Sequence, residues 1–176
     1  RRIVESSPMG MFFYELQKDN RLVFVGSNPA ADRILGIECA KLVGKTIEEA
    51  FPGLAETDIP DSYREVIQTG RGWQREEVNY DREPICGAYQ VMAFQTSATR
   101  MAVMFMDITE RKRNERVLHQ LQTAVEASIA GFAMAEMDGL ISYVNPAFVQ
   151  MWGLDDKEQA LGRSVAEFWS KPERAH

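Results

Sequence analysis

The side chains that could carry redox, metal or nucleophilic chemistry are few and scattered. The chain has two cysteines, Cys39 and Cys86, and two histidines, His119 and His176. They form no cluster with metal-ligand spacing, there is no phosphate-binding loop, and no nucleophile can be placed beside a base. Two cysteines in a chain of this size indicate free thiols in a reducing compartment, here the cytoplasm, rather than a disulfide scaffold. The pattern predicts that the chain itself is not an enzyme.

Two polar residues, Asp107 and Thr109, stand between an apolar stretch, residues 101–106, and a charged stretch, residues 110–116. A hydroxyl just before a helix can accept a backbone N–H of its first turn, so Thr109 is the expected N-cap. We expect the side chains of both residues to form hydrogen bonds across a junction between a strand and a helix. The simpler alternative is that Thr109 is only a cap and Asp107 only a polar strand end.

The bulk composition is that of a globular domain. The 176 residues are 45% hydrophobic and 26% charged, with a net charge of −6 and a pI near 5.1. An acidic balance argues against a nucleic-acid-binding surface. No apolar run approaches the roughly 18 residues of a membrane span, so no membrane segment is expected in the chain. Because the chain starts with Arg1 instead of Met, we expect it to be a fragment of a longer protein.

One phrase of the sequence occurs twice. Residues 4–10 match residues 125–131, and Asn28-Pro29-Ala30 matches Asn145-Pro146-Ala147. The likeness continues from residues 42–46 to residues 160–164. A period above about 100 residues is too long for a solenoid and indicates tandem copies of one domain. The first copy has room for a whole domain, and the second has room for about half.

The first copy is expected to open with a β-hairpin and a short helix. Residues 11–16 and 21–25 are rich in β-forming side chains and flank a polar turn. Asn28 is a good N-cap, Pro29 suits the first helical position, and Gly36 suits the residue after the last turn.

Later segments predict a second helix, three strands and a connecting helix. Asp61 and Gly70 would cap and stop the helix. The apolar last strand lacks alternation, which predicts a central strand that is covered on both faces. The expected ranges are 62–69 for the helix, 73–80, 88–95 and 101–106 for the strands, and 110–125 for the connecting helix. The predicted fold class is α+β, with an antiparallel sheet and its helices on one face.

The chain resembles the PAS sensory domain family. The resemblance rests on Asn28-Pro29-Ala30-Ala31 after a hairpin, on the Asp107-Ile108-Thr109-Glu110-Arg111 ending, and on the restart at Asn145. It implies a five-stranded antiparallel sheet of order 2-1-5-4-3, a pocket between sheet and helices, and dimerisation. The domains implied are a complete PAS domain over residues 1–109, a signalling helix over residues 110–125, and the first half of a second PAS domain over residues 126–176.

The resemblance also implies candidate sites. Asp107 and Thr109 would relay a signal from the last strand to the helix. The pocket lining is expected to come from the following side chains: Phe24, Ile34, Leu35, Val66, Met92, Phe94 and Met104. Ordinary core packing is the alternative for the methionines.

The cofactor is left unknown by the sequence. Haem-binding members of the family use a His on a helix of the domain, and neither His119 nor His176 lies there. Flavin photosensors use a Cys within Asn-Cys-Arg, and Cys39 lacks that context. The sequence therefore argues against both groups. His119 is expected to be a helix-surface residue, because the motif of a phosphoacceptor His is missing.

The expected function is a sensory module that binds a small molecule or a partner. It would relay the signal through its C-terminal helix as a homodimer within a larger sensor histidine kinase or diguanylate cyclase, alongside other domains of the parent chain. The alternative is a ligand-free PAS scaffold that acts only in dimerisation. A pocket of several hundred Å³ would favour a ligand, and a core filled by Met92, Phe94 and Met104 would favour the scaffold.

The truncated second copy carries its own expectation. By family topology its first strand, near residues 132–137, lacks the last-strand partner. We therefore expect residues 126–176 to pair with a second copy or to dock on the first domain. The reason is a half-covered apolar face that would contain Phe148, Trp152, Phe168 and Trp169.

Overall fold

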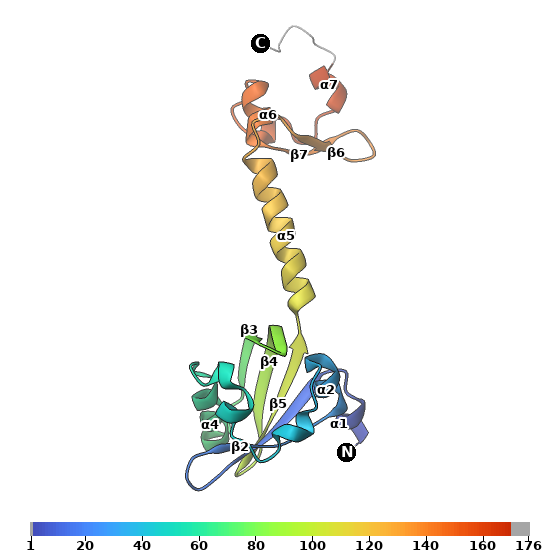
Figure 1. Cartoon of the computed structure of the whole chain (residues 1–176). Coiled ribbons are helices and arrows are strands. Elements are labelled where there is room, and N and C mark those ends of the chain that lie inside the picture. Colours follow the sequence, from blue (N-terminus) through green and yellow to red (C-terminus); the bar gives the residue numbers. More distant parts are fainter. Residues whose placement is uncertain (1, 170–176) are drawn as a thin grey trace. The chain divides into compact units, whose positions relative to one another are not determined.

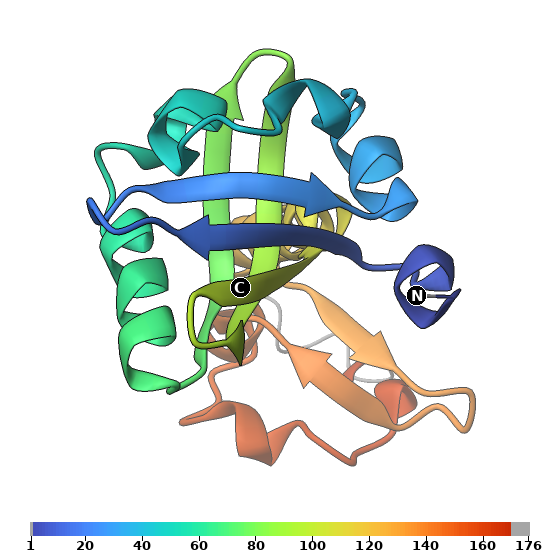
Figure 2. The same ribbon diagram turned by 90° about the horizontal axis from the view of Figure 1, so that it is seen from below.

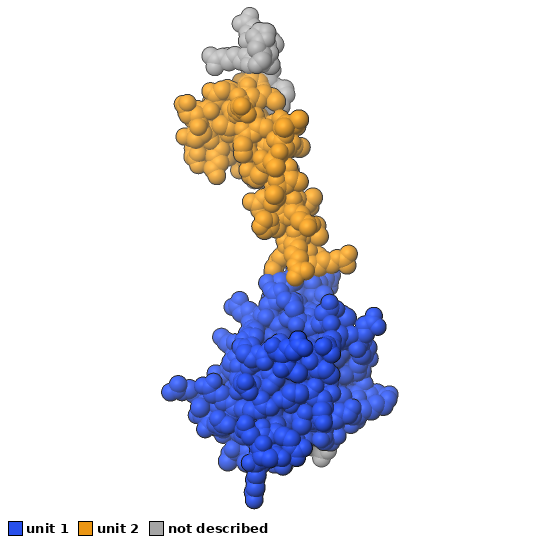
Figure 3. Space-filling model, turned by 60° about the vertical axis from the view of Figure 1, so that its left-hand side comes forward, with its two compact units in different colours: residues 1–112 blue, residues 113–176 orange. Residues whose placement is uncertain are grey.

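The computed structural model describes residues 2–169, with side chains from Val4 to Phe168. It divides into two compact units, residues 1–112 (unit 1) and residues 113–176 (unit 2) (Figure 3).

Unit 1 is an α+β unit built on one five-stranded antiparallel sheet (Figure 1). The strand order is β2-β1-β5-β4-β3, which confirms the predicted order and places β5 at the centre. The strands are β1 (Gly10–Leu16), β2 (Leu22–Ser27), β3 (Trp73–Arg82), β4 (Ile85–Ser97) and β5 (Arg100–Asp107). The helices are α1 (Arg2–Ser6), α2 (Pro29–Leu35), α3 (Ile47–Ala50) and α4 (Ile59–Thr69), with short 3-10 turns at Cys39–Leu42 and Pro52–Leu54.

The caps of α2 form as the sequence predicts. The Asn28 side chain accepts a hydrogen bond from the Ala31 N–H, and Pro29 occupies the first turn. Gly36 ends the helix with φ of 67°, a left-handed conformation that costs glycine little.

The start of α4 differs from the prediction. The helix begins at Ile59, one turn before residue 62, with Pro60 in its first turn. Asp61 therefore lies inside the helix and does not cap it. Pro60 suits this position because first-turn N–H groups have no partner within the helix. Gly70 ends α4 as predicted, with φ of 70°.

The core of unit 1 lies between the sheet and the helices. Its sheet side comes from alternate residues of each strand, such as Phe12 and Tyr14 on β1 and Val103 and Phe105 on β5. Side chains of α2, α3 and α4 complete the cluster. The sheet is twisted, so that β1 and β2 run across the direction of β3 and β4 (Figure 2).

Unit 2 repeats the opening of unit 1 in shorter form. Helix α5 (Thr109–Glu126) is followed by strands β6 (Ala133–Ala135) and β7 (Ile141–Val144) and helices α6 (Pro146–Met151) and α7 (Val165–Trp169). The two strands form a separate antiparallel pair.

One expectation for unit 2 needs correction. Phe148 and Phe168 are 2% and 5% exposed, and they pack with Ile141 and Val144 in a small core of their own. They are not on an open face, because α7 folds back over α6 and brings their rings to 5.4 Å. Trp152 is half-buried against the same cluster, and the Trp169 side chain lies outside the described residues. Whether residues 126–176 pair with another copy stays a prediction.

Candidate functional site

The junction between β5 and α5 is held by three hydrogen bonds. The Thr109 N–H donates to Asp107 Oδ1 at 2.8 Å. The Ala88 N–H on β4 donates to Thr109 Oγ1 at 3.0 Å, and the Ile108 N–H donates to the Ala88 carbonyl at 2.9 Å. The side-chain roles differ from the prediction, because Asp107 is the acceptor at the helix start and the Thr109 hydroxyl bonds to a neighbouring strand.

Gly87 lies between the Thr109 side chain and the buried ring of Tyr89. A Cβ atom at residue 87 would lie 2.7 Å from Thr109 Oγ1 and 3.0 Å from the Tyr89 hydroxyl oxygen. Both distances are too short for a carbon atom, so residue 87 has room only for glycine unless the two side chains move. The first turn of α5 is also tied to β3, because Lys112 Nζ lies 2.9 Å from Glu77 Oε2.

A small apolar cavity lies behind Tyr89. Its volume is about 70 Å³, and its walls come from β1, β3, β4, β5, α2 and α4 and the turn at Pro52–Leu54. Tyr89 and Phe105 both line it, with ring centroids 6.1 Å apart in a T-shaped arrangement. Tyr89 directly follows Ala88 in the sequence, and Phe105 lies two residues before Asp107. The cavity wall is therefore connected to the junction through both strands.

Of the seven predicted lining residues, only Leu35 lines this cavity. Met92, Phe94 and Met104 belong to the opposite face of the sheet. Side chains alternate along a strand, and the neighbours Val91 and Val103 are the ones that point inward. Three further residues belong to or pack against the core without lining the cavity: Phe24, Ile34 and Val66.

The sequence reasoning missed the aromatic lining. Phe12, Tyr14, Tyr63, Tyr80 and Tyr89 are among the residues that surround the cavity. For Phe12, Tyr14 and Tyr89 the available signal was the period-two pattern of β1 and β4, which places them on the inward face of the sheet together with Val91.

The cavity wall carries neutral hydroxyl groups and no charged side chain. Burial raises the pKa of Tyr89 to about 12 and holds the pKa values of Tyr14 and Tyr63 well above the usual range. The Tyr80 hydroxyl accepts a hydrogen bond from the Gly53 N–H at 3.4 Å. The cavity therefore suits a small, neutral, mostly apolar molecule better than an ion.

Cys39, Cys86 and His119 do not line the cavity. Cys39 and Cys86 are both free thiols. Burial raises the pKa of Cys39 to about 12, and a hydrogen bond to Asp81 raises the pKa of Cys86. Neither is therefore an activated thiolate. His119 lies exposed on α5, with Nδ1 3.2 Å from Thr123 Oγ1, and His176 lies outside the described residues. No group of metal-ligating side chains gathers among residues 2–169.

Two asparagines do more than the sequence indicated. Besides capping α2, Asn28 accepts from the Met11 N–H and donates to the carbonyls of Val4 and Met9. Asn145 repeats this pattern in unit 2, where it accepts from the Phe132 N–H. It donates to the Ala130 carbonyl and, at 2.9 Å, to the carbonyl of Val125 in the last turn of α5. Each asparagine thus ties the end of the preceding helix to its own unit.

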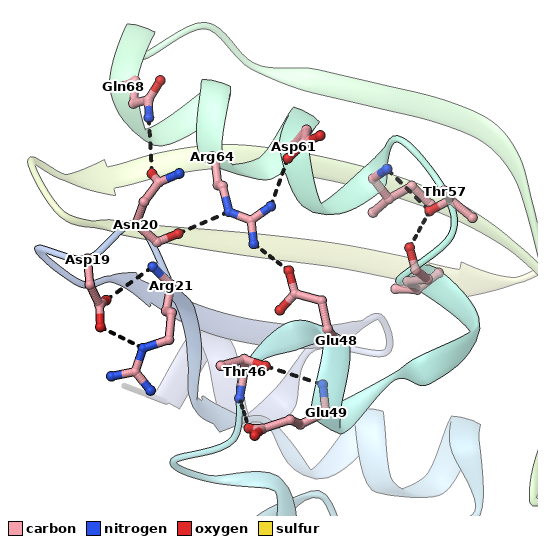
Figure 4. A network of polar contacts seen from close by, with 12 residues as sticks. Asp19, Asn20, Arg21, Thr46, Glu48, Glu49, Thr57, Asp61, Arg64 and Gln68 are labelled. Carbon is pink, nitrogen blue, oxygen red and sulfur yellow. Dashed lines mark hydrogen bonds and ion pairs between the residues drawn. The ribbon is translucent and has the colours of Figure 1, made fainter.

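Arg64 on α4 links helices α3 and α4 to the turn of the β1–β2 hairpin through polar contacts (Figure 4). Its guanidinium donates to the Asn20 carbonyl at 3.1 Å and to Asp61 at 2.8 Å, and it also pairs with Glu48 on α3. The Arg64 side chain is 17% exposed. The network holds α3 and α4 against the hairpin turn.

We expect Arg64→Ala to lower the free energy of unfolding by about 1–2 kcal/mol, because partly buried charged groups lose their partners. Urea unfolding would measure it. Arg21→Ala is the matched control, since the Arg21 side chain is 63% exposed and pairs with Asp19, two residues away. Its effect should stay within about 0.5 kcal/mol. Equal effects of the two variants would contradict a fastening role for Arg64.

Comparison with known proteins agrees with this architecture. A family model described as "PAS fold" matches residues 4–113, and one described as "PAS domain" matches residues 119–175. The chain belongs to the PAS family, whose members are sensory signalling modules and generally non-catalytic. No curated protein matches the chain.

Solved structures show the same fold. An RNA-binding light-oxygen-voltage receptor superposes with a TM-score of 0.52 at 19% identity, covering 69% of this chain and 36% of the receptor. The PAS domain of a protein from Colwellia psychrerythraea has a TM-score of 0.50 at 14% identity, covering 62% and 94%. The chain thus spans about a third of the receptor's length. No helix among the described residues is long and apolar enough to cross a membrane.

Proposed function

We propose that unit 1 is a sensory input domain that passes its state to α5 through Asp107 and Thr109. The input would be a small neutral molecule in the cavity, or a partner domain. The domain division would be a complete PAS domain over residues 1–109, a signalling helix over residues 110–125, and the first half of a second PAS domain over residues 126–176. The parent would be a cytoplasmic sensor kinase or cyclase.

The observation that carries this proposal is a continuous series of contacts and hydrogen bonds from the cavity wall to the start of α5. Tyr89 lines the cavity, packs against Gly87, and follows Ala88, whose N–H is bonded to Thr109 Oγ1. A shift of the Tyr89 ring would move the β4 backbone that holds Thr109. Because the Thr109 N–H is bonded to Asp107 as well, such a shift would reach the first turn of α5.

The second candidate function is a ligand-free scaffold, and the small size of the cavity supports it. A volume of about 70 Å³ is well below the roughly 300–1,000 Å³ of sites for drug-sized ligands. The core is filled by aromatic rings, and Met92, Phe94 and Met104 do not fill it. A scaffold would still use the junction, with a partner protein as its input.

Dimerisation through α5 is part of the proposal. Val117, Leu118 and Leu121 are 46%, 66% and 58% exposed. They lie at helical spacing, so the helix presents an apolar stripe that a second copy of α5 could cover. The stripe is shorter than the three or four heptads that define a coiled coil.

Xenon is a suitable probe of the path, because dry apolar cavities take it up. In the unmodified chain, xenon should shift the NMR signals of Tyr89 and Phe105 and also the amide signals of residues 109–112. In Thr109→Ala the cavity signals should still shift, but those of residues 109–112 should not. The variant should cost about 1 kcal/mol of stability, since one hydrogen-bond acceptor is lost.

Thr109→Ser keeps the hydroxyl and is the matched control, which should behave like the unmodified chain. An undiminished response of residues 109–112 in Thr109→Ala would show that the junction does not relay. If xenon leaves the cavity signals of the unmodified chain unchanged, the scaffold candidate is the better one.

A further inference from the structure

A surface groove lies beside the apolar cavity of unit 1. Its volume is about 840 Å³, within the roughly 300–1,000 Å³ of sites for small molecules. It runs between residues 36–42, which follow α2, and residues 82–85 at the end of the β3–β4 hairpin. Ala50 and Pro52 complete its wall. The groove is therefore large enough for a ligand, unlike the cavity.

Only a thin wall separates the groove from the cavity. The side chains of Tyr80 and Ile85 line both spaces. Beside them, Leu35 lines the cavity and the next residue, Gly36, lines the groove. The turn at Pro52–Leu54 also contributes residues to both spaces. Movement of one side chain in this wall would therefore join the groove to the cavity.

The Tyr80 side chain is held in the wall by weak contacts. Its hydroxyl accepts from the Gly53 N–H at 3.4 Å, which is longer than the roughly 2.7–3.2 Å of ordinary N–H···O bonds. Its ring meets the Phe51 ring edge-on, with 6.3 Å between the centroids. A Cβ atom at residue 53 would lie 2.8 Å from the Tyr80 ring, so a larger residue there would displace the ring. Tyr80 is 8% exposed, which closes the wall in this structure, but the groove leaves space for the ring to rotate outward.

The groove is more polar than the cavity. Its wall includes the charged side chains of Glu38, Lys41, Arg82 and Glu83. Lys41 Nζ lies 2.9 Å from Glu38 Oε2. Positive and negative side chains are equal in number, so the groove suits a neutral hydrogen-bonding group better than an ion. The cavity on the other side of Tyr80 is lined by apolar and aromatic side chains.

We propose that Tyr80 is a movable wall between the cavity and the groove, and that the two spaces together bind an amphipathic small molecule. Its apolar end enters the cavity, and its neutral polar end, such as a hydroxyl or an amide, stays in the groove. This inference rests on the proposed function, because it specifies the class of the input molecule. It also accounts for the small cavity, since about 70 Å³ is less than half the roughly 150 Å³ of an apolar cavity that takes up benzene.

Hexanol is a suitable probe, because the closed cavity cannot enclose its six-carbon chain. NMR of the whole 176-residue chain should show NOEs from the methyl group of hexanol to the rings of Tyr89 and Phe105 in the cavity. The methylene group next to the hydroxyl should show NOEs to Leu42 in the groove. A bound molecule with both sets of contacts must pass Tyr80, so the unmodified chain alone tests whether the wall opens.

Tyr80→Phe removes the hydrogen bond to Gly53 and keeps the ring. Because weaker closure raises the fraction of open molecules, the Kd for hexanol should fall about two- to five-fold. Tyr63→Phe is the matched control, since Tyr63 lines the cavity but not the groove, and it should leave the Kd unchanged. Gly53→Ala should also lower the Kd, because the added methyl group would displace the Tyr80 ring.

NOEs to only one of the two spaces, no binding of hexanol, or equal Kd values for Tyr80→Phe and Tyr63→Phe would each overturn the proposal. Xenon separates this failure from a failure of the relay, because xenon is small enough for the closed cavity. If hexanol fails but xenon still shifts the amide signals of residues 109–112, the movable wall is wrong and the relay stands. If hexanol contacts both spaces but residues 109–112 respond to neither probe, the relay is wrong and the binding site stands.

Discussion

Phe12→Ala should lower the free energy of unfolding of unit 1 by about 3–5 kcal/mol, at the upper end for a core truncation. The Phe12 ring lies 4.7–5.1 Å from the rings of Phe24, Phe51 and Phe105, measured between centroids. It also forms part of the cavity wall. Its removal would merge new space with the existing 70 Å³, and a site that already contains a cavity has little scope to collapse. Urea unfolding followed by NMR signals of β1 would measure the loss.

Phe13→Ala is the matched control for this prediction. Phe13 is the next residue on the same strand but faces the other side of the sheet, and it is half-buried. Its truncation should cost clearly less in the monomer.

Benzene should restore part of the lost stability to Phe12→Ala, because it binds engineered apolar cavities of about 150 Å³. It should not stabilise Phe13→Ala. Equal losses for the two variants, with no effect of benzene, would contradict the assignment of Phe12 to the cavity wall.

Asn28→Ala should cost about 3 kcal/mol. Asn28 is 3% exposed, and its side chain forms four hydrogen bonds to backbone groups. Loss of the helix cap accounts for about 1 kcal/mol, and the buried N–H and carbonyl groups left without partners account for the rest. Thermal unfolding, together with hydrogen exchange of the Met11 and Ala31 amides, would measure the loss.

Asn28→Asp tests which half of the side chain matters. The carboxylate keeps an acceptor for Met11 and Ala31 but removes both donated bonds, to Val4 and Met9. We expect faster exchange near the end of α1 while the α2 cap stays protected. If Asn28→Ala instead cost no more than about 1 kcal/mol, the residue would be only a helix cap.

The β5–α5 junction illustrates how far sequence reasoning reached into the candidate site. Asp107 and Thr109 were recognisable because a polar pair separates an apolar strand from a charged helix. Their bonding partners were not, since Ala88 lies 21 residues before Thr109. The same holds for Asn28, whose capping role follows from its neighbours in sequence but whose bond to Val4 spans 24 residues.

The sequence by itself determined the local elements and their family. Turn residues and caps act over a few residues, so they predict the hairpin and α2. The repeated Asn-Pro-Ala phrase predicts a second copy of the domain, and the PAS resemblance predicts the strand order. The helix ends were less certain, because Pro60 and Asp61 both suit a helix start.

Only the tertiary structure decided which face of each strand is buried. Methionine, phenylalanine and valine occupy both faces of β1, β4 and β5, so apolarity alone could not assign Met92, Phe94 and Met104. Helices α2 and α4 pack on one side, and that choice depends on contacts between residues far apart in the chain. It places the aromatic rings around the cavity and leaves Met92, Phe94 and Met104 on the opposite face of the sheet.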